Sequence, residues 1–403
     1  MLASEVPHTG THNRRTFGGA MSSVAADATP ARGLLRILGL AFGMAAVVGN
    51  MVGVGIMRTP GPTAGRLGEP ALIYLVWLGL GIYVLMAANT MAELATAIPK
   101  AGGPYLYVRR AFGDYLGFVS GWGDFAVQSI AIGYLSVAAS EFLAQVLPVL
   151  AGHERLVAPG LIVIFATLNS LGLRTSSTLV QLVSVFKVLM LWALVVAAFS
   201  YSGAPLNPAR AVAVGTHAAG IVAIIVSMQL VLEVYGGFNC ACYFSEETNH
   251  PGRTVPRALL YGVLLVMGIY LAVNAAVLHI MSPAELGTSK LAVGEALARL
   301  YGPAAGTAVA LLAIISTFGV LNTAMLLAPR ILYGMSRDGL STARGTYVTR
   351  QGVPLPALSC VRLPLDPGHR ACIRDGVAHG VRSRQSPPES RGRRRTRSDL
   401  PTV

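Results

Sequence analysis

Residues 49–57 read GNMVGVGIM and lie inside a long apolar stretch of the chain. Each glycine weakens a helix by up to about 1 kcal/mol relative to alanine, so this run forms a poor continuous helix. Residues 235–239, which read YGGFN, interrupt a second apolar stretch in a similar way. We therefore predict two helices that are broken part-way along their length.

The overall composition is that of a protein embedded in a lipid bilayer. Of its 403 residues, 53% are hydrophobic and 12% are charged, whereas about 25% of residues are charged in soluble domains. Long apolar stretches alternate with short charged segments, the pattern of a protein that crosses a membrane several times. Much of the net charge of +13 lies in the joining segments and in an arginine-rich C-terminal segment. We therefore expect a lipid bilayer as partner and no nucleic acid.

Eight apolar stretches approach the length of about 20 residues that a spanning helix needs. They lie roughly at 35–57, 71–98, 116–147, 157–173, 178–201, 217–244, 257–281 and 303–334. Two shorter segments, 104–114 and 290–302, are expected to form interfacial helices. Lysine and arginine are more frequent in the loops on the side of the N-terminus. This bias predicts a multi-pass protein of the plasma (inner) membrane with a cytoplasmic N-terminus.

The two breaks have a specific chemistry in a membrane. Unwound backbone exposes N–H and C=O groups at mid-bilayer, where no water satisfies them. The N-terminus of a half-helix favours a carboxylate, and freed carbonyls favour an ammonium group. Two such breaks facing each other suit a zwitterion, and paired broken spans are the sequence sign of an inverted-repeat secondary transporter. The alternative is that the glycines only allow close helix packing.

Four segments of the chain resemble a known family. They are GVGI at 53–56, AEL to PKAGGPY over 92–105, YGGFN to PRA over 235–258, and RILYGMSRDG at 330–339. In order and spacing they are similar to the amino acid–polyamine–organocation superfamily of permeases, and the resemblance covers about residues 34–357. It implies an all-α integral membrane fold of the inverted-repeat 5+5 type with broken first and sixth spans. It also implies amino acid or amine substrates moved by proton symport or by exchange.

The resemblance places the substrate on the two broken spans. The residues expected to bind it are Gly53, Val54, Gly55 and Ile56 at the carboxylate end, and Tyr235, Gly236 and Gly237 at the amine end. We thus predict amino acid transport across the membrane by alternating access. The alternatives are a permease for polyamines or other cationic amines, and a truncated membrane fragment that does not transport.

Among the ionisable residues within the spans, where a charge costs about 2.5–3.5 kcal/mol or more, three are candidates for a function. Lys187 is the candidate for proton coupling, and the family has a lysine near this place; alternatively, it holds carbonyls of the broken first span. Glu233 stands two residues before the second break, where several members of the family have a bulky aromatic side chain. It is a candidate to bind a cationic substrate group or to carry the proton. Asp124 is expected to face a water-filled cavity.

Other chemistries find no support in the sequence. Cys240 and Cys242 lie in an apolar run and are expected to be buried free thiols, and the spacing of the cysteines fits neither a metal site nor a disulfide framework. We find no phosphate-binding loop, no metal-binding motif and no catalytic motif. The prediction is a protein that is not an enzyme and has no cofactor or metal.

Glu246 and Glu247 are expected to form ion pairs with Arg109 or Arg110.

The chain changes character after residue 356. Residues 357–403 contain ten arginines, no lysine and no further apolar span. We expect residues 1–33 to be a disordered cytoplasmic tail, 34–340 to be the permease domain, and 341–403 to be a basic, disordered tail. The second repeat would then be incomplete. The abrupt end of the family pattern favours a changed reading frame near 358–366 over an authentic basic tail.

Overall fold

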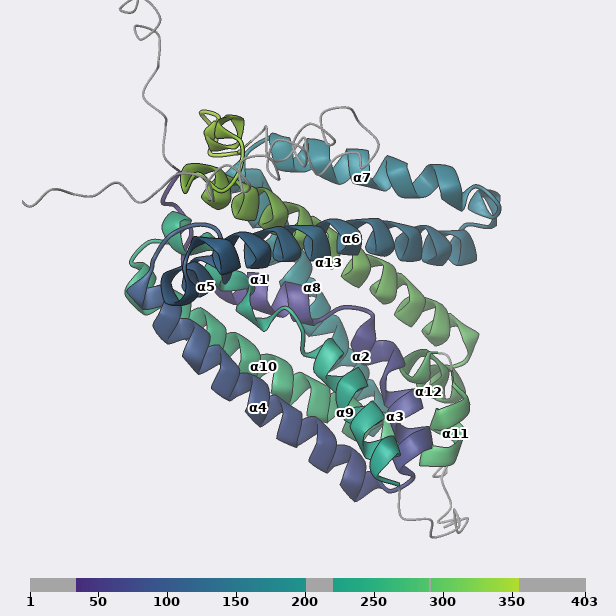
Figure 1. Cartoon of the computed structure of the whole chain (residues 1–403). Helices are drawn as coiled ribbons and strands as arrows, with labels where there is room; N and C mark the ends of the chain where they lie inside the picture. Colours follow the sequence, from purple (N-terminus) through teal and green to yellow (C-terminus); the bar gives the residue numbers. More distant parts are fainter. Residues whose placement is uncertain (1–33, 201–219, 290, 355–403) are drawn as a thin grey trace, which may run out of the picture.

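The structure is a computed structural model that describes residues 34–200, 220–289 and 291–354. Figure 1 shows these residues as a bundle of helices. Apart from one isolated bridge between Leu38 and Thr248, all regular secondary structure of the described residues is helical. The predicted N-terminal tail, 1–33, and residues 355–403 of the predicted C-terminal tail, 341–403, lie outside the described residues. Residues 341–354 of that tail are described and include a short 3-10 helix.

Six helical segments are long and apolar enough to cross a membrane. They are α4 (Pro70–Ala97), α6 (Asp114–Val146), α8 (Leu173–Ser200), α9 (Ile221–Val234) with the following 3-10 helix η2 (Phe238–Glu247), α10 (Pro251–Ile280) and α13 (Pro303–Arg337). The prediction of an all-α integral membrane protein is confirmed.

The other elements are shorter. They are α1 (Leu40–Met51), α2 (Gly55–Arg58), α3 (Pro60–Leu67), α5 (Tyr105–Phe112), η1 (Pro148–Leu150), α7 (Glu154–Ser170), α11 (Pro283–Thr288), α12 (Ala292–Tyr301) and η3 (Ala343–Thr346). The first predicted span corresponds to α1 and α2, and the fourth corresponds to α7. The two segments predicted to be interfacial contain α5 and α12.

Helix α1 lies at the centre of the bundle. It packs against α10, α8, α13 and η2, while α4 runs along α10 and α6 runs along α13 (Figure 1). Such a position requires small and apolar side chains on all sides of the helix. Residues 45–48 read AAVV and are all buried, and a Cβ atom on Gly43 would lie 2.7 Å from the Cβ of Ala258 on α10.

Three aromatic side chains fill the space between α4, α9 and α10. The ring of Tyr235 lies 5.1 Å from that of Tyr270 and 6.1 Å from that of Trp77. All three residues are fully buried. The cluster therefore fixes the end of α9, where the second break begins.

We call the end of the bundle where residues 34–39 lead into α1 the proximal end. Here Arg330 pairs with Glu247, with Nη2 and Oε2 2.8 Å apart, and Arg337 pairs with Glu246 at 2.6 Å. Arg109 pairs instead with Asp114 and Asp338. The prediction that Glu246 and Glu247 pair with Arg109 or Arg110 is therefore wrong: the partners of both come from α13, which packs against η2.

Candidate functional site

The first break separates α1 from α2. Helix α1 ends at Met51 and α2 begins at Gly55, so residues 52–54 are not helical. The backbone N–H groups of Val54, Gly55 and Ile56 donate to no acceptor among the described residues. Free N–H groups of this kind are typical of the start of a helix and attract anions.

The second break separates α9 from η2. Helix α9 ends at Val234, and Gly237 has a φ of +86°, a conformation that favours glycine. The carbonyl oxygens of Tyr235 and Gly236 accept no hydrogen bond from the described residues. These carbonyls are available to an ammonium group.

The two breaks face each other. Asn50 Nδ2 donates to the carbonyl of Gly237 at 3.4 Å, and a Cβ atom on Gly55 would lie 3.0 Å from Val234 Cγ2. The hydroxyl of Tyr270 lies 2.7 Å from the Met51 carbonyl and 3.1 Å from the Val234 carbonyl, so it joins the last turns of α1 and α9. Sequence reasoning missed Tyr270, although a hydroxyl in the middle of an apolar span is a usable signal.

A cavity of about 560 Å³ opens between the breaks, which we call the central cavity. Of the residues predicted to bind substrate, the following line it: Gly53, Val54, Gly55, Glu233, Gly236 and Gly237. Ile56 and Tyr235 do not line it, because their side chains are fully buried in the core. The structure thus brings together six of the eight predicted residues around one space.

Three charged side chains line the central cavity: Arg58, Asp124 and Glu233. Asp124 Oδ2 accepts a hydrogen bond from the hydroxyl of Tyr243 at 2.8 Å. The guanidinium of Arg58 lies 5.4 Å from the ring of Phe142. Glu233 is exposed and forms no ion pair with the described residues. The cavity therefore offers two carboxylates, and that of Glu233 is open to a charged group of the substrate.

Lys187 lies outside the central cavity. It is fully buried on α8, and its ammonium donates to the carbonyls of Gly49 at 3.0 Å and Val52 at 2.9 Å. These carbonyls belong to the last turn of α1 and to the residue that follows it, where no helical partner is available. No carboxylate among the described residues forms an ion pair with it. The contacts are those of a side chain that holds the first break, and proton coupling stays a prediction.

The thiols of Cys240 and Cys242 are free and buried, as predicted. No cluster of three or more metal-ligating side chains occurs within the described ranges. The polar groups of the central cavity are thus backbone amides and carbonyls together with a few side chains. Such a set can hold a small organic zwitterion.

A family model described as amino acid permease matches residues 38–363. The chain belongs to this amino acid permease family. The matched range includes both breaks and all the residues that line the central cavity. Amino acid transport across a membrane, the function expected from the sequence, is confirmed at the level of the family.

Several transporters are similar to this permease. The serine/threonine exchanger SteT of Bacillus subtilis is 28% identical over 310 residues, which are 76% of this chain and 70% of the exchanger. The b(0,+)-type amino acid transporter 1 of Oryctolagus cuniculus is 26% identical over 359 residues, which are 83% and 70% of the two chains. The Asc-type amino acid transporter 1 of Mus musculus is 27% identical over 341 residues, which are 81% and 63%.

The permease should tolerate no side chain at Gly237. An alanine would have to keep a φ of +86°, and its Cβ atom would clash with the side-chain amide of Asn50. We expect Gly237→Ala to lower uptake of labelled amino acid into proteoliposomes by tenfold or more, since the left-handed backbone alone costs about 1–2 kcal/mol. Gly79→Ala is the control, because nothing lies within 4 Å of its Cβ position on α4. Equal uptake by the two variants would contradict the assignment of this break to the site.

Proposed function

We propose that this permease carries amino acids by alternating access, with the substrate held between its two breaks. The free N–H groups of Val54 and Gly55 bind the carboxylate. The free carbonyl of Gly236 binds the ammonium group. The observation that carries the proposal is that these donors and this acceptor, left free by the described residues, belong to residues that line one cavity between the two breaks. This makes the chain a transporter and not an enzyme, with residues 34–340 as the transporting unit.

In this proposal, the proximal end lies on the cytoplasmic side of the plasma membrane. It carries Arg109, Arg330 and Arg337, in agreement with the excess of positive residues on cytoplasmic loops. Their ion pairs close the bundle at this end. The central cavity lies beyond them, so with this orientation we propose that the structure is a state closed to the cytoplasm.

Two modes of energy coupling fit this site. Symport with protons is favoured by Lys187, an ammonium held in the core without a carboxylate partner among the described residues. Exchange of one amino acid for another is favoured by the similarity to a serine/threonine exchanger. Both modes use the same binding residues. They differ in whether the carrier can change between its outward-facing and inward-facing states without a bound amino acid.

Uptake into proteoliposomes tests the proposal. We expect saturable uptake of free amino acids and none of two analogues, the decarboxylated amine and the N-acetylated acid. An inward proton gradient should raise uptake if symport operates, and internal amino acid should raise it if exchange operates. A linear, non-saturating flux would indicate a channel. Absence of uptake by folded protein would reject transport by this chain, and preference for the decarboxylated amine would support an amine permease.

Glu233 is proposed to set the preference among amino acids. It lines the central cavity without a charged partner among the described residues, so it attracts a cationic side chain of the substrate. We expect Glu233→Gln to lower uptake of lysine relative to serine by about tenfold, equivalent to about 1.4 kcal/mol. Glu69→Gln, an exposed change before α4, is the control. An unchanged lysine-to-serine ratio in Glu233→Gln would remove Glu233 from substrate selection.

A further inference from the structure

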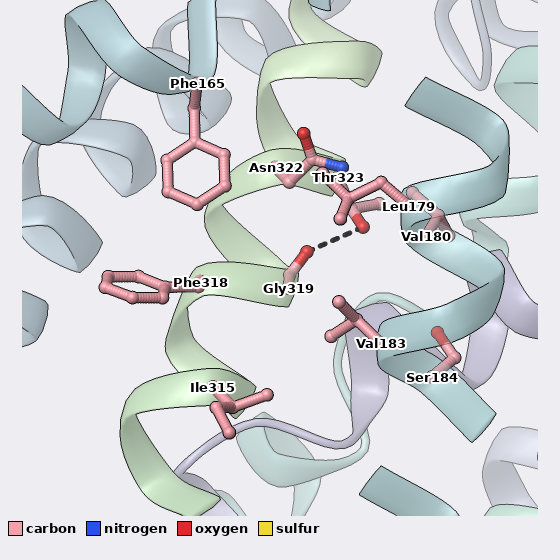
Figure 2. Close-up of a pocket in the computed structure, with 10 residues that line it drawn as sticks. All are labelled: Phe165, Leu179, Val180, Val183, Ser184, Ile315, Phe318, Gly319, Asn322 and Thr323. Carbon is pink, nitrogen blue, oxygen red and sulfur yellow. Dashed lines mark hydrogen bonds between the residues drawn. The ribbon is translucent and has the colours of Figure 1, made fainter. Parts of the chain in front are cut away.

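A cavity of about 490 Å³ lies at the proximal end of the bundle, and we call it the proximal cavity. Its walls come from the end of α4 and the loop that follows, from α5, from the start of α6 and from the residue after α13. The cavity between α7, α8 and α13 in Figure 2 is different, because its walls are mostly apolar, as at Phe165 and Phe318. The proximal cavity is lined mainly by charged side chains. Its volume is typical of ligand sites, which measure about 300–1,000 Å³.

Three cations and two carboxylates line the proximal cavity. The cations are Lys100, Arg109 and Arg110, and the carboxylates are those of Asp114 and Asp338. Arg109 engages both carboxylates, since its Nε lies 2.7 Å from Asp114 Oδ1 and its Nη1 lies 2.6 Å from Asp338 Oδ2. Lys100 and Arg110 are exposed and form no ion pair with the described residues. The cavity therefore has an excess of positive charge, and two of its cations are free to meet an anion.

The paired arginine fixes the shape of this cavity. Arg109 links α5 to α6 through Asp114 and to the end of α13 through Asp338. Gly117 lets α6 lie against this arginine, because a Cβ atom there would lie 2.5 Å from Arg109 Cβ. Gly113, with a φ of +89°, makes the sharp turn between the two helices. The neighbouring Arg110 is therefore presented from a braced corner of the bundle.

The proximal cavity lies at the level where helices leave the bilayer. Ala97 is the last residue of the spanning helix α4, and Asp114 is the first residue of the spanning helix α6. At the corner between α5 and α6, Phe112 is 69% exposed, and Leu116 is also exposed. Apolar side chains next to cations are typical of a segment that lies at a membrane surface. A ligand of this cavity would thus meet positive charge on one side and apolar surface on the other.

We propose that the proximal cavity binds the headgroup of an anionic phospholipid. The phosphate accepts hydrogen bonds from the guanidinium of Arg110 and the ammonium of Lys100, and the acyl chains lie against Phe112 and Leu116. Basic pockets between spanning helices on the cytoplasmic side are typical sites for such headgroups. The lipid is a ligand of the corner between α5 and α6 and not a substrate, because the proximal cavity and the central cavity have no lining residue in common.

Native mass spectrometry of the intact chain in detergent tests the site. The first probe is dioleoylphosphatidylglycerol, which is anionic. The second is dioleoylphosphatidylcholine, which has the same chains and no net charge, and the third is glycerol 3-phosphate, which has no chains. We expect phosphatidylglycerol to bind on the order of tenfold more tightly than either of the others. Equal binding of the two lipids would overturn the role of the cations. Equally tight binding of glycerol 3-phosphate would show a site for a soluble anion and overturn the lipid assignment.

Arg110→Gln removes one free cation without breaking an ion pair. It should weaken phosphatidylglycerol binding about fivefold, the contribution of one basic residue near a membrane surface, and Arg110→Lys should retain most of the binding. Arg174→Gln is the control, because Arg174 is exposed and unpaired among the described residues at the start of α8, outside the proximal cavity. Equal effects of Arg110→Gln and Arg174→Gln would overturn the assignment to this cavity.

Phe112→Ser tests the apolar part of the site. It should weaken binding of both dioleoyl lipids and leave that of glycerol 3-phosphate unchanged, since only the lipids have chains to lose contact. Unchanged lipid binding in Phe112→Ser would contradict the placement of the chains at this corner. Lipid binding in detergent requires no transport, so its outcome is separate from that of the uptake assay.

Discussion

Replacing Arg330 with methionine is expected to destabilise the permease strongly. Its Nε and Nη2 donate to the two carboxylate oxygens of Glu247, each at 2.8 Å, and its guanidinium lies 4.5 Å from the ring of Phe244. The side chains of the ion pair are 3% and 0% exposed. Removal of one partner leaves an uncompensated buried charge, at a cost of about 3–5 kcal/mol. Thermal unfolding in detergent would show this as a large fall in Tm.

The chain provides a matched comparison for this ion pair. Arg299 and Glu285 form the same kind of pair at 3.0 Å, but the side chains are 40% and 46% exposed. Arg299→Met should therefore cost about 1 kcal/mol or less. The double change Arg330→Met with Glu247→Met should recover much of the stability lost in Arg330→Met, because no lone charge stays buried. Equal effects of Arg330→Met and Arg299→Met would contradict the buried ion pair.

Replacing Lys187 with methionine is expected to abolish transport. The change removes the donor to the Gly49 and Val52 carbonyls, and each buried carbonyl left without a donor costs about 1–3 kcal/mol. We expect the first break to rearrange, so that both uptake and equilibrium binding of the amino acid fall by tenfold or more. Uptake and scintillation proximity binding, measured on the same preparation, would separate loss of the site from loss of coupling.

Lys100→Met is the control for this change, since Lys100 is exposed in the loop before α5. It should retain normal uptake. If Lys187→Met bound amino acid normally and lost only its response to a proton gradient, Lys187 would be a coupling residue and its contacts with α1 would be dispensable. If it transported normally in every assay, both roles would be excluded.

The positions of the breaks were predictable because backbone conformation at these places depends on local sequence. Glycines at 53, 55, 236 and 237 disfavour a continuous helix whatever surrounds them. The structure places the breaks where the glycines lie. The same reasoning cannot say which side chains point into the space between the breaks, and so Ile56 and Tyr235 were included although their side chains belong to the core.

Side-chain partners were harder to predict because they depend on helix packing. The sequence singled out Glu246 and Glu247 as members of ion pairs but assigned them to Arg109 or Arg110, which were expected on the same side of the membrane. Their partners are Arg337 and Arg330, which α13 brings to η2 from more than 80 residues away, at separations of 91 and 83 residues. The pairing of Asn169 with Asn322, 153 residues apart, has no local signal at all.

The bridge between Leu38 and Thr248 has a mechanical consequence. The N–H groups of Ile37 and Leu38 both donate to the Glu247 carbonyl at 3.0 Å, and Asn249 N–H donates to the Leu38 carbonyl at 2.8 Å. These bonds tie the start of α1 to the end of η2, so we expect the proximal halves of the two broken spans to turn as one body about two hinges. Spin labels at positions 36 and 249 should keep one distance through the transport cycle. A label on α6 should move relative to both.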